Sequence, residues 1–200
     1  LIIGGGIAGV TAAETIREKD TSSSLVILSK ETSPLYSRVL LPNYIRGKVE
    51  REKVYLRKAA DYSERDITLV TGEEASQIDI EAKRVRTKMG ADFFYHKLLI
   101  TTGGTLLPWG KGERILRLQT IEDADHCLLA RRRGGAEAIV VGGGFIALEF
   151  IETSMAYRFT THLFIREKKF FGDILDDEGW DIVRSNFERH GVRGYPEAEV

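Results

Sequence analysis

The feature that most constrains the fold is a segment that occurs twice and ends each time in a glycine-rich turn. LIIGGGIAGVTAAETI begins at Leu1, and IVVGGGFIALEFIET begins at Ile139 with the same layout. Each copy has a short β-branched apolar run, then closely spaced glycines, then apolar residues at helical spacing. The repeat predicts two units of similar local structure, in which a strand leads through a tight turn into an amphipathic helix.

The spacing of the glycines gives these turns a chemical meaning. The turn positions are Gly4, Gly6 and Gly9 in the first copy, and Gly142, Gly144 and Ala147 in the second. In this pattern the first glycine permits the turn, the second lets the backbone approach a pyrophosphate, and the third lets helix and strand pack closely. The helix that follows offers amide groups and the positive end of its dipole to the phosphates. Two such turns predict two bound dinucleotides, as electron transfer between nicotinamide and flavin requires.

The segments around the repeats predict an α/β fold with two Rossmann-like domains built on parallel sheets. A second apolar strand follows each helix, at Leu25–Leu28 and at residues 163–165, which completes two βαβ units. Residues 76–102 alternate between apolar and polar and contain a Met-Gly-Ala-Asp turn, which predicts an antiparallel insertion in the first domain. A helix is expected over residues 120–133, with Thr120 as its N-cap.

We place the border between the domains in the linker Pro-Trp-Gly-Lys-Gly at residues 108–112, because proline and glycine interrupt both helix and strand. The expected dinucleotide-binding domains are therefore residues 1–110 and residues 111–200, and the resemblance described below implies that the first binds FAD and the second NAD(P). The second domain is expected to be incomplete, since its sequence stops near the start of a third strand.

Composition argues against several other classes of protein. The formal net charge is −1 with interspersed signs, so nucleic acid is not an expected partner. No run approaches the roughly 18 apolar residues needed to cross a bilayer, and a membrane role is not expected. The single cysteine, Cys127, rules out an internal disulfide and is typical of a cytoplasmic protein. The four histidines lack metal-ligand spacing, and no metal site or catalytic side chain is assigned.

On these motifs the chain resembles the two-dinucleotide flavoprotein reductases of the pyridine nucleotide-disulfide oxidoreductase family. LLITTGGTLLP is similar to the family's second flavin-domain motif, and GGGFIALE is similar to its NAD(P) site. The resemblance implies that FAD lies on the first turn, with contributions from Thr102 and Gly103. It places NAD(P)H on the second turn, with Glu149 near the nicotinamide.

The stretch PLYSRVLLPNYIRG, residues 34–47, is similar to the family segment that lines the isoalloxazine ring. Position 39, where some relatives carry a redox cysteine, is Val39 here, so electrons are expected to leave the flavin directly. Arg38 is expected to contact FAD, because a guanidinium can hold phosphate oxygens or an anionic reduced flavin. The YSR element most resembles rubredoxin reductases, ferredoxin reductases and the flavin domain of nitrite reductases. Ferredoxin reductases usually have lysine where this chain has Asn43.

Side chains that follow the second strand of each unit are candidates for binding the ribose. Glu31 is the only acid at this place in the first unit. In the second unit Arg166 favours NADPH, because a guanidinium can pair with a 2′-phosphate, whereas Glu167 could accept hydrogen bonds from the ribose hydroxyls of NADH. The sequence leaves the choice between the two coenzymes open.

The predicted function is an FAD-dependent NAD(P)H oxidoreductase without a redox-active cysteine. It would pass a hydride from NAD(P)H to FAD and electrons onward to a small carrier protein or redox centre of the rubredoxin, ferredoxin or nitrite reductase type. Two alternatives are a flavin-dependent monooxygenase, which also carries two glycine turns, and a dinucleotide-binding module that performs no turnover.

Overall fold

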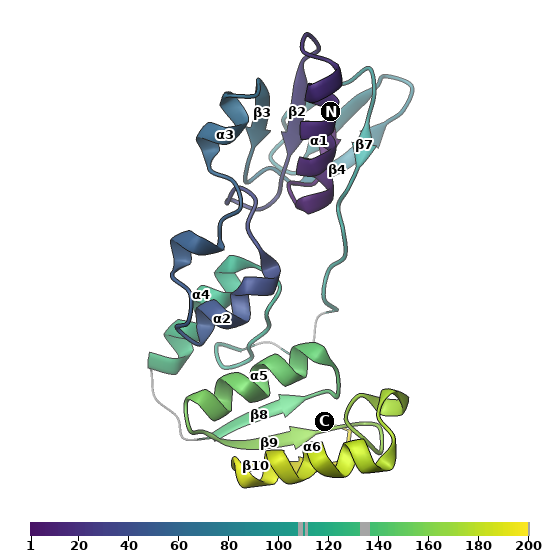
Figure 1. Cartoon of the computed structure of the whole chain (residues 1–200). Coiled ribbons are helices and arrows are strands. Elements are labelled where there is room, and N and C mark those ends of the chain that lie inside the picture. Colours follow the sequence, from purple (N-terminus) through teal and green to yellow (C-terminus); the bar gives the residue numbers. More distant parts are fainter. Residues whose placement is uncertain (108–109, 111, 133–136, 200) are drawn as a thin grey trace. The chain divides into compact units, whose positions relative to one another are not determined.

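A computed structural model describes residues 1–107, 110, 112–132 and 137–199, and its contacts divide the chain into two compact units (Figure 1). The first unit comprises Leu1–Arg38 and Arg51–Pro108, and the second comprises Val39–Glu50 and Trp109–Val200. Most of the predicted linker and the predicted end of the helix at Arg133 lie outside the described residues. The assignment of one cofactor to each domain stays a prediction, whereas residues 39–50 group with the second unit rather than the first.

The first unit is built on a parallel sheet with the strand order β3-β2-β1-β7. Its strands are β1 (Ile2–Ile3), β2 (Leu25–Leu28), β3 (Ile67–Val70) and β7 (Leu99–Ile100). Helix α1 (Ile7–Lys19) connects β1 to β2 and buries Val10 and Ala13 against Ile2 on one face of the sheet. Neighbouring residues of a strand point to opposite faces, so Ile3 belongs to a second cluster on the other face.

That other face of the first sheet is covered by the predicted antiparallel insertion. Strands β4 (Ala75–Asp79), β5 (Arg84–Thr87) and β6 (Asp92–Phe94) pair in the order β4-β5-β6. The central strand contributes Val85, which is fully buried with Ile3 and Leu28. The sequence prediction of a parallel sheet with an antiparallel insertion is therefore confirmed.

Short helices follow β2. The chain forms η1 (Arg38–Leu40), α2 (Leu41–Ile45), η2 (Arg51–Val54) and α3 (Ala59–Ser63) in this order. Helix α2 packs against α4 and α5 of the second unit, which explains why residues 39–50 belong there. We name Val39–Glu50 the strap, because it leaves the first unit, joins the second and returns.

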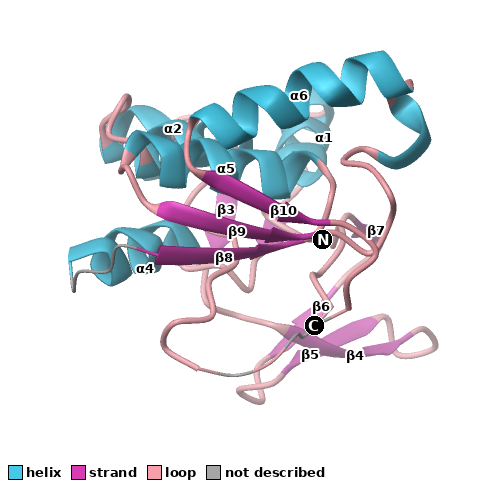
Figure 2. Ribbon diagram, turned by 90° about the horizontal axis from the view of Figure 1, so that it is seen from below, coloured by secondary structure: helices cyan, strands magenta, loops and turns pink. Residues whose placement is uncertain are grey.

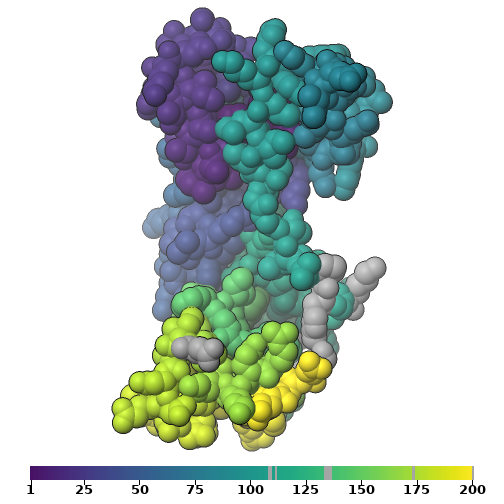
Figure 3. Space-filling model, turned by 90° about the vertical axis from the view of Figure 1, so that its right-hand side faces the viewer, coloured from purple at the N-terminus to yellow at the C-terminus, as the bar shows by residue number. Residues whose placement is uncertain are grey.

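The second unit contains a parallel sheet with the order β10-β9-β8. Its elements are α4 (Ile121–Arg132), β8 (Glu137–Val141), α5 (Phe145–Ala156), β9 (Thr160–Phe164), η3 (Gly172–Ile174), α6 (Asp177–Arg189) and β10 (Val192–Tyr195). Helices α5 and α6 cover one face of this sheet (Figure 2), and the green to yellow part of the chain, which contains both helices, lies together in the space-filling view (Figure 3). Ile151 and Leu163 are fully buried beneath the helices, whereas Ile139 on the opposite face is 68% exposed.

Thr120 caps α4 as predicted, because its hydroxyl accepts the Asp123 N–H at 3.2 Å and the Asp123 carboxylate accepts the Thr120 N–H at 2.9 Å. Among the described residues, no helix has both the length and the apolar character needed to cross a membrane. The same part of the chain holds no group of three or more His, Cys, Asp or Glu side chains placed to bind a metal ion.

Candidate functional site

The first glycine turn lies between β1 and α1, and close contacts leave no room for a side chain at Gly4 or Gly9. Gly4 has a φ of +117°, and its N–H donates to Leu28 O at 2.8 Å. A Cβ on Gly4 would lie 2.2 Å from Thr101 O, and a Cβ on Gly9 would lie 2.0 Å from Gly4 O. Both positions therefore require glycine, as the spacing predicted.

Gly6 differs from its neighbours because its surroundings are open. A Cβ built on Gly6 meets no described atom within 4 Å, although this residue is the N-cap of α1. Its backbone is extended, with φ −78° and ψ −176°, so the glycine is not needed for conformation. The space beside it is what a pyrophosphate would need in order to approach the first amides of α1.

The second glycine turn repeats this geometry between β8 and α5. Gly142 has a φ of +121°, and its N–H donates to Phe164 O at 2.9 Å, as Gly4 donates to β2. Gly144 is the N-cap of α5, and a Cβ built on it also meets open space. Ala147 is accommodated in the sixth position, where its Cβ would lie 3.9 Å from a Cβ on Gly142.

The helices that follow the two glycine turns differ from α4 and α6 in their first turns. For α1 and α5, the structure shows neither a side-chain cap nor an acidic residue in the described first turn. Helix α6 instead has Asp176 as its cap and Asp177 and Glu178 in its first turn. The positive ends of α1 and α5 thus lack the carboxylates that would repel a phosphate.

The structure brings together two predicted FAD residues at the end of β2. Arg38 donates to Glu31 Oε1 at 2.5 Å, and Tyr36 Oη donates to Glu31 Oε2 at 2.5 Å. The Arg38 guanidinium also lies 5.4 Å from the centroid of the Tyr36 ring. Tyr36 was not predicted as a site residue, although it begins the YSR element and lies between Glu31 and Arg38 in the sequence. This cluster offers both a carboxylate and a cation after the end of β2.

Thr102 and Gly103 lie just after the end of β7, separated from it by Thr101. Thr102 lines a pocket of about 320 Å³ together with Ile3, Ile100 and residues of β4. Gly103 has a φ of +65°, and a Cβ built on it meets no described atom within 4 Å. The preceding residue, Thr101, was not predicted, yet its hydroxyl donates to Ile3 O at 2.9 Å and fastens β7 to β1.

Glu149 lies in α5, one turn after its first residue, and forms an ion pair with Arg46 of the strap. Arg46 Nη1 lies 2.8 Å from Glu149 Oε2 and 3.0 Å from Glu152 Oε2, while Nη2 donates to Asn43 Oδ1 at 3.0 Å. The side chain of Arg46 is only 8% exposed, compared with 39% for Glu149. Arg46 was not singled out from the sequence, because its acidic partners are more than 100 residues away.

Arg166 and Glu167 follow the end of β9, as predicted, and they contact each other at 3.1 Å. Hydrogen bonding by its own backbone amide, followed by the contact with Arg166, lowers the pKa of Glu167. The Arg166 side chain is 76% exposed and Ile165 is fully buried, so the guanidinium is available at the strand end. The coenzyme preference stays a prediction.

Cys127 is buried in α4 and its thiol lies 3.8 Å from Arg117 O. Burial, followed by the nearby carboxylate of Asp123, raises its pKa to about 12. A thiol in this environment remains protonated at neutral pH and is a poor nucleophile. The geometry therefore supports a structural role for Cys127.

Two buried polar atoms have no hydrogen-bond partner among the described residues, namely Arg46 Nε and Glu73 Oε2. Glu73 follows β3, and its N–H donates to Ser29 O at 2.9 Å, next to the end of β2. An unpaired buried acceptor is costly unless a donor reaches it. The open space at Gly6 and Gly144 leaves room for a phosphate group at the start of α1 and of α5.

Residues 1–200 match the family described as pyridine nucleotide-disulphide oxidoreductase. Apoptosis-inducing factor 3 of Mus musculus is 28% identical over 100% of this chain and 33% of its own length. A ferredoxin–NAD(+) reductase component of the 3-phenylpropionate/cinnamic acid dioxygenase of Photorhabdus laumondii is 33% identical over 77% of this chain and 40% of its own length.

Among solved structures, a covalent putidaredoxin reductase–putidaredoxin complex aligns with a TM-score of 0.87 at 24% identity and shares the fold. It covers 100% of this chain, which in turn spans 49% of the matched chain. The chain thus spans between about a third and a half of the length of these proteins. The resemblance inferred from the glycine turns is confirmed, and with it FAD and NAD(P)H as the family's cofactors. The chain belongs to the pyridine nucleotide-disulphide oxidoreductase family.

Proposed function

We propose that the whole protein is an FAD-dependent NAD(P)H oxidoreductase that holds FAD on the first glycine turn and NAD(P)H on the second. The observation that carries this proposal is the duplicated turn geometry, in which Gly4 and Gly142 have nearly the same φ and make the same hydrogen bond to the neighbouring strand. Binding of two dinucleotides by one chain is what hydride transfer from nicotinamide to flavin requires.

In the first unit, the amides that begin α1 bind the pyrophosphate beside Gly6. Glu31 accepts hydrogen bonds from the adenosine ribose, and Arg38 balances negative charge on the cofactor. Thr102 contributes its hydroxyl and Gly103 its backbone amide at the end of β7. When bound, FAD supplies the acceptor for a hydride and passes electrons on singly or in pairs.

In the second unit, the amides that begin α5 bind the nicotinamide dinucleotide beside Gly144, with Gly142 and Ala147 shaping the turn. Glu149 orients the nicotinamide end. Arg166 contacts a 2′-phosphate when the coenzyme is NADPH, and Glu167 contacts the ribose hydroxyls when it is NADH. No acid or base from this chain is needed, because orientation of the two cofactors accounts for catalysis.

The electron acceptor is proposed to be a small carrier protein or a redox centre of the rubredoxin, ferredoxin or nitrite reductase type. The names of two matched proteins, a ferredoxin–NAD(+) reductase component and a putidaredoxin reductase, support this class of partner. A dithiol relay is not proposed, because the sequence has one cysteine, which is buried. We place this activity in the cytoplasm, because a single cysteine within these 200 residues excludes an internal disulfide here and fits a reducing compartment.

The test is an absorption spectrum of the purified whole protein, followed by anaerobic titration with NADH and, separately, with NADPH. A flavin band that one of the nucleotides bleaches supports the proposal and identifies the coenzyme. A protein that binds both cofactors without bleaching would be a dinucleotide-binding module. Bleaching followed by oxygen insertion into an organic substrate would indicate a monooxygenase, and a protein that takes up no FAD would refute the proposal.

A further inference from the structure

The strap is bound to the second unit by an apolar contact of α2. Leu41 and Ile45 are 1% and 2% exposed, and α2 packs against both α4 and α5. Because α2 has only one and a half turns, it has little stability of its own and depends on these helices for its order. Residues that α4 and α5 hold in this way should move with the second unit.

Hydrogen bonds reinforce this contact at two places on α2. Tyr44 Oη donates to Asp125 Oδ1 of α4 at 2.7 Å. Tyr157, which follows α5, donates its hydroxyl hydrogen to the carbonyl oxygen of Ile45. The guanidinium of Arg131 lies 3.8 Å from the centroid of the Tyr157 ring and fixes that ring in place.

Arg46 is the charged part of the attachment and ends α2. Its guanidinium joins Glu149 and Glu152 of α5 to Asn43 of its own helix, at distances of 2.8 to 3.0 Å. The cation is nearly buried, whereas both carboxylates are partly exposed. Removing Arg46 would therefore leave two carboxylates of like charge one turn apart, without the cation that holds them to the strap.

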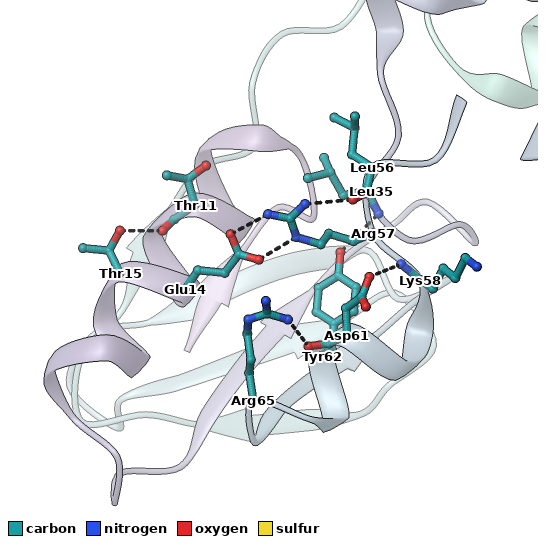
Figure 4. Close-up of polar contacts among 10 residues, drawn as sticks. All are labelled: Thr11, Glu14, Thr15, Leu35, Leu56, Arg57, Lys58, Asp61, Tyr62 and Arg65. Atoms are coloured by element: carbon teal, nitrogen blue, oxygen red, sulfur yellow. Dashed lines mark hydrogen bonds and ion pairs between the residues drawn. The ribbon is translucent and has the colours of Figure 1, made fainter. Parts of the chain in front are cut away.

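The segments that flank the strap are anchored separately, within the first unit. The outgoing and returning segments pair through the antiparallel bridge between Tyr36 and Tyr55, and the Ser37 N–H donates to Val54 O at 2.8 Å. Farther along, Arg57 forms a bidentate ion pair with Glu14 of α1, with distances of 2.7 and 3.1 Å (Figure 4). Because these flanking contacts lie within the first unit, the order of the strap itself depends on its contacts with α4 and α5.

We propose that Arg46 is a positioning residue that holds the strap on the second unit and makes its order respond to a nucleotide at the second glycine turn. Glu149 lies one turn into α5, and side chains of a helix lean toward its N-terminus, where the phosphates would bind. Their negative charge favours a nearby cation, so nucleotide binding tightens the hold of Arg46. This response rests on the proposed function, whereas the attachment itself does not.

The experiment is hydrogen–deuterium exchange of the whole protein, with and without NADP⁺ or NAD⁺, in Arg46→Met, Arg46→Lys and Lys48→Met variants. The informative amides are those of Arg46, Gly47 and Lys48, which donate to Pro42, Tyr44 and Asn43. Lys48→Met is the matched control, because it removes one positive charge from the exposed side of the same strap.

Without nucleotide, Arg46→Met should speed exchange of these amides about tenfold, since local opening loses its ion pairs. Lys48→Met should match wild type, and Arg46→Lys should fall between, because lysine keeps the charge but lacks the planar fork. Nucleotide should slow strap exchange in wild type and in Lys48→Met, but not in Arg46→Met. Exchange of α1 amides should be unchanged throughout.

If the strap amides of Arg46→Met exchanged at the wild-type rate, the proposal that Arg46 holds the strap on the second unit would be refuted. If Arg46→Met does not fold, equal exchange rates of the strap amides in Arg46→Lys and in wild type would refute the same proposal. If nucleotide protected residues 142–148 but left the exchange of the strap amides unchanged, the response to nucleotide would be refuted and the attachment through Arg46 would stand. If nucleotide gave no protection at residues 142–148, both the proposed function and the response to nucleotide would be refuted. The exchange rates of the variants without nucleotide would still test whether Arg46 holds the strap.

Discussion

An alanine at position 9 would place its Cβ 2.0 Å from Gly4 O and 2.7 Å from Thr101 Oγ1. The first of these atoms belongs to the backbone of the turn, so α1 must shift away from β1 to relieve the contact. Overpacking of this kind costs about 3 kcal/mol. The better helix propensity of alanine returns about 1 kcal/mol. We therefore expect Gly9→Ala to lower the free energy of unfolding by about 2 kcal/mol.

The assay is urea unfolding followed by circular dichroism, with two comparison variants. Ala147→Gly changes the equivalent position of the second turn, where alanine is already accommodated in the buried cluster, and should cost about 1 kcal/mol of helix propensity and about 1 kcal/mol for the lost burial of one methyl group. Gly6→Ala should change stability by less than about 1 kcal/mol, because its Cβ enters open space at an N-cap. It should nevertheless weaken FAD binding, because the methyl group occupies the space proposed for the pyrophosphate.

The direction in which Gly9→Ala changes the free energy of unfolding tests the close approach of α1 to β1. If Gly9→Ala were more stable than wild type, helix propensity alone would be acting and the close approach of α1 to β1 would be wrong. If Gly6→Ala bound FAD as tightly as wild type in a fluorescence titration, the pyrophosphate would not lie beside Gly6.

Three further predictions concern single side chains. The hydrogen bond from Arg57 lowers the pKa of Glu14 below its ordinary value of 4.5, so this carboxylate stabilises the fold above that pH and the stabilisation is lost as the pH falls through the lowered pKa. Arg57→Met should therefore flatten the acid limb of a pH–stability curve, and an unchanged limb would contradict the ion pair. Cys127 should resist a thiol reagent at mildly alkaline pH until the protein is unfolded in guanidinium chloride, because its pKa is about 12; rapid labelling of the native protein would contradict its burial. Arg166→Ala should raise KM for NADPH about tenfold and leave KM for NADH unchanged, as expected for loss of one charged contact to a phosphate; equal changes for both coenzymes would rule out that contact.

The glycine turns could be predicted because their requirements are local. Gly4 needs a positive φ and Gly9 needs the absence of a Cβ, and both requirements are visible as spacing within a few residues of an apolar strand. The strands and helices around them follow from periodicity, which is why the parallel sheets and the antiparallel insertion agree with the sequence prediction.

The position of the strap could not be predicted, because contacts distant in sequence determine it. Tyr44 and Arg46 find their partners on α4 and α5, about 80 to 100 residues later in the chain. The role of Thr101 also depends on pairing between distant segments, because its hydroxyl donates to the carbonyl oxygen of Ile3 at the start of the chain. Side chains that join distant elements therefore form the part of the site that composition and spacing do not show.

Because of the strap, dividing the chain after residue 110 would separate α2 from the helices that it packs against. A piece that starts at residue 111 would contain α4 and α5 but not α2, so the surface that buries Leu41 and Ile45 would be exposed to water. A piece that ends at residue 110 would carry the missing helix. Produced as separate polypeptides, the two pieces should recognise each other through α2, in the manner of a split protein whose halves complement one another.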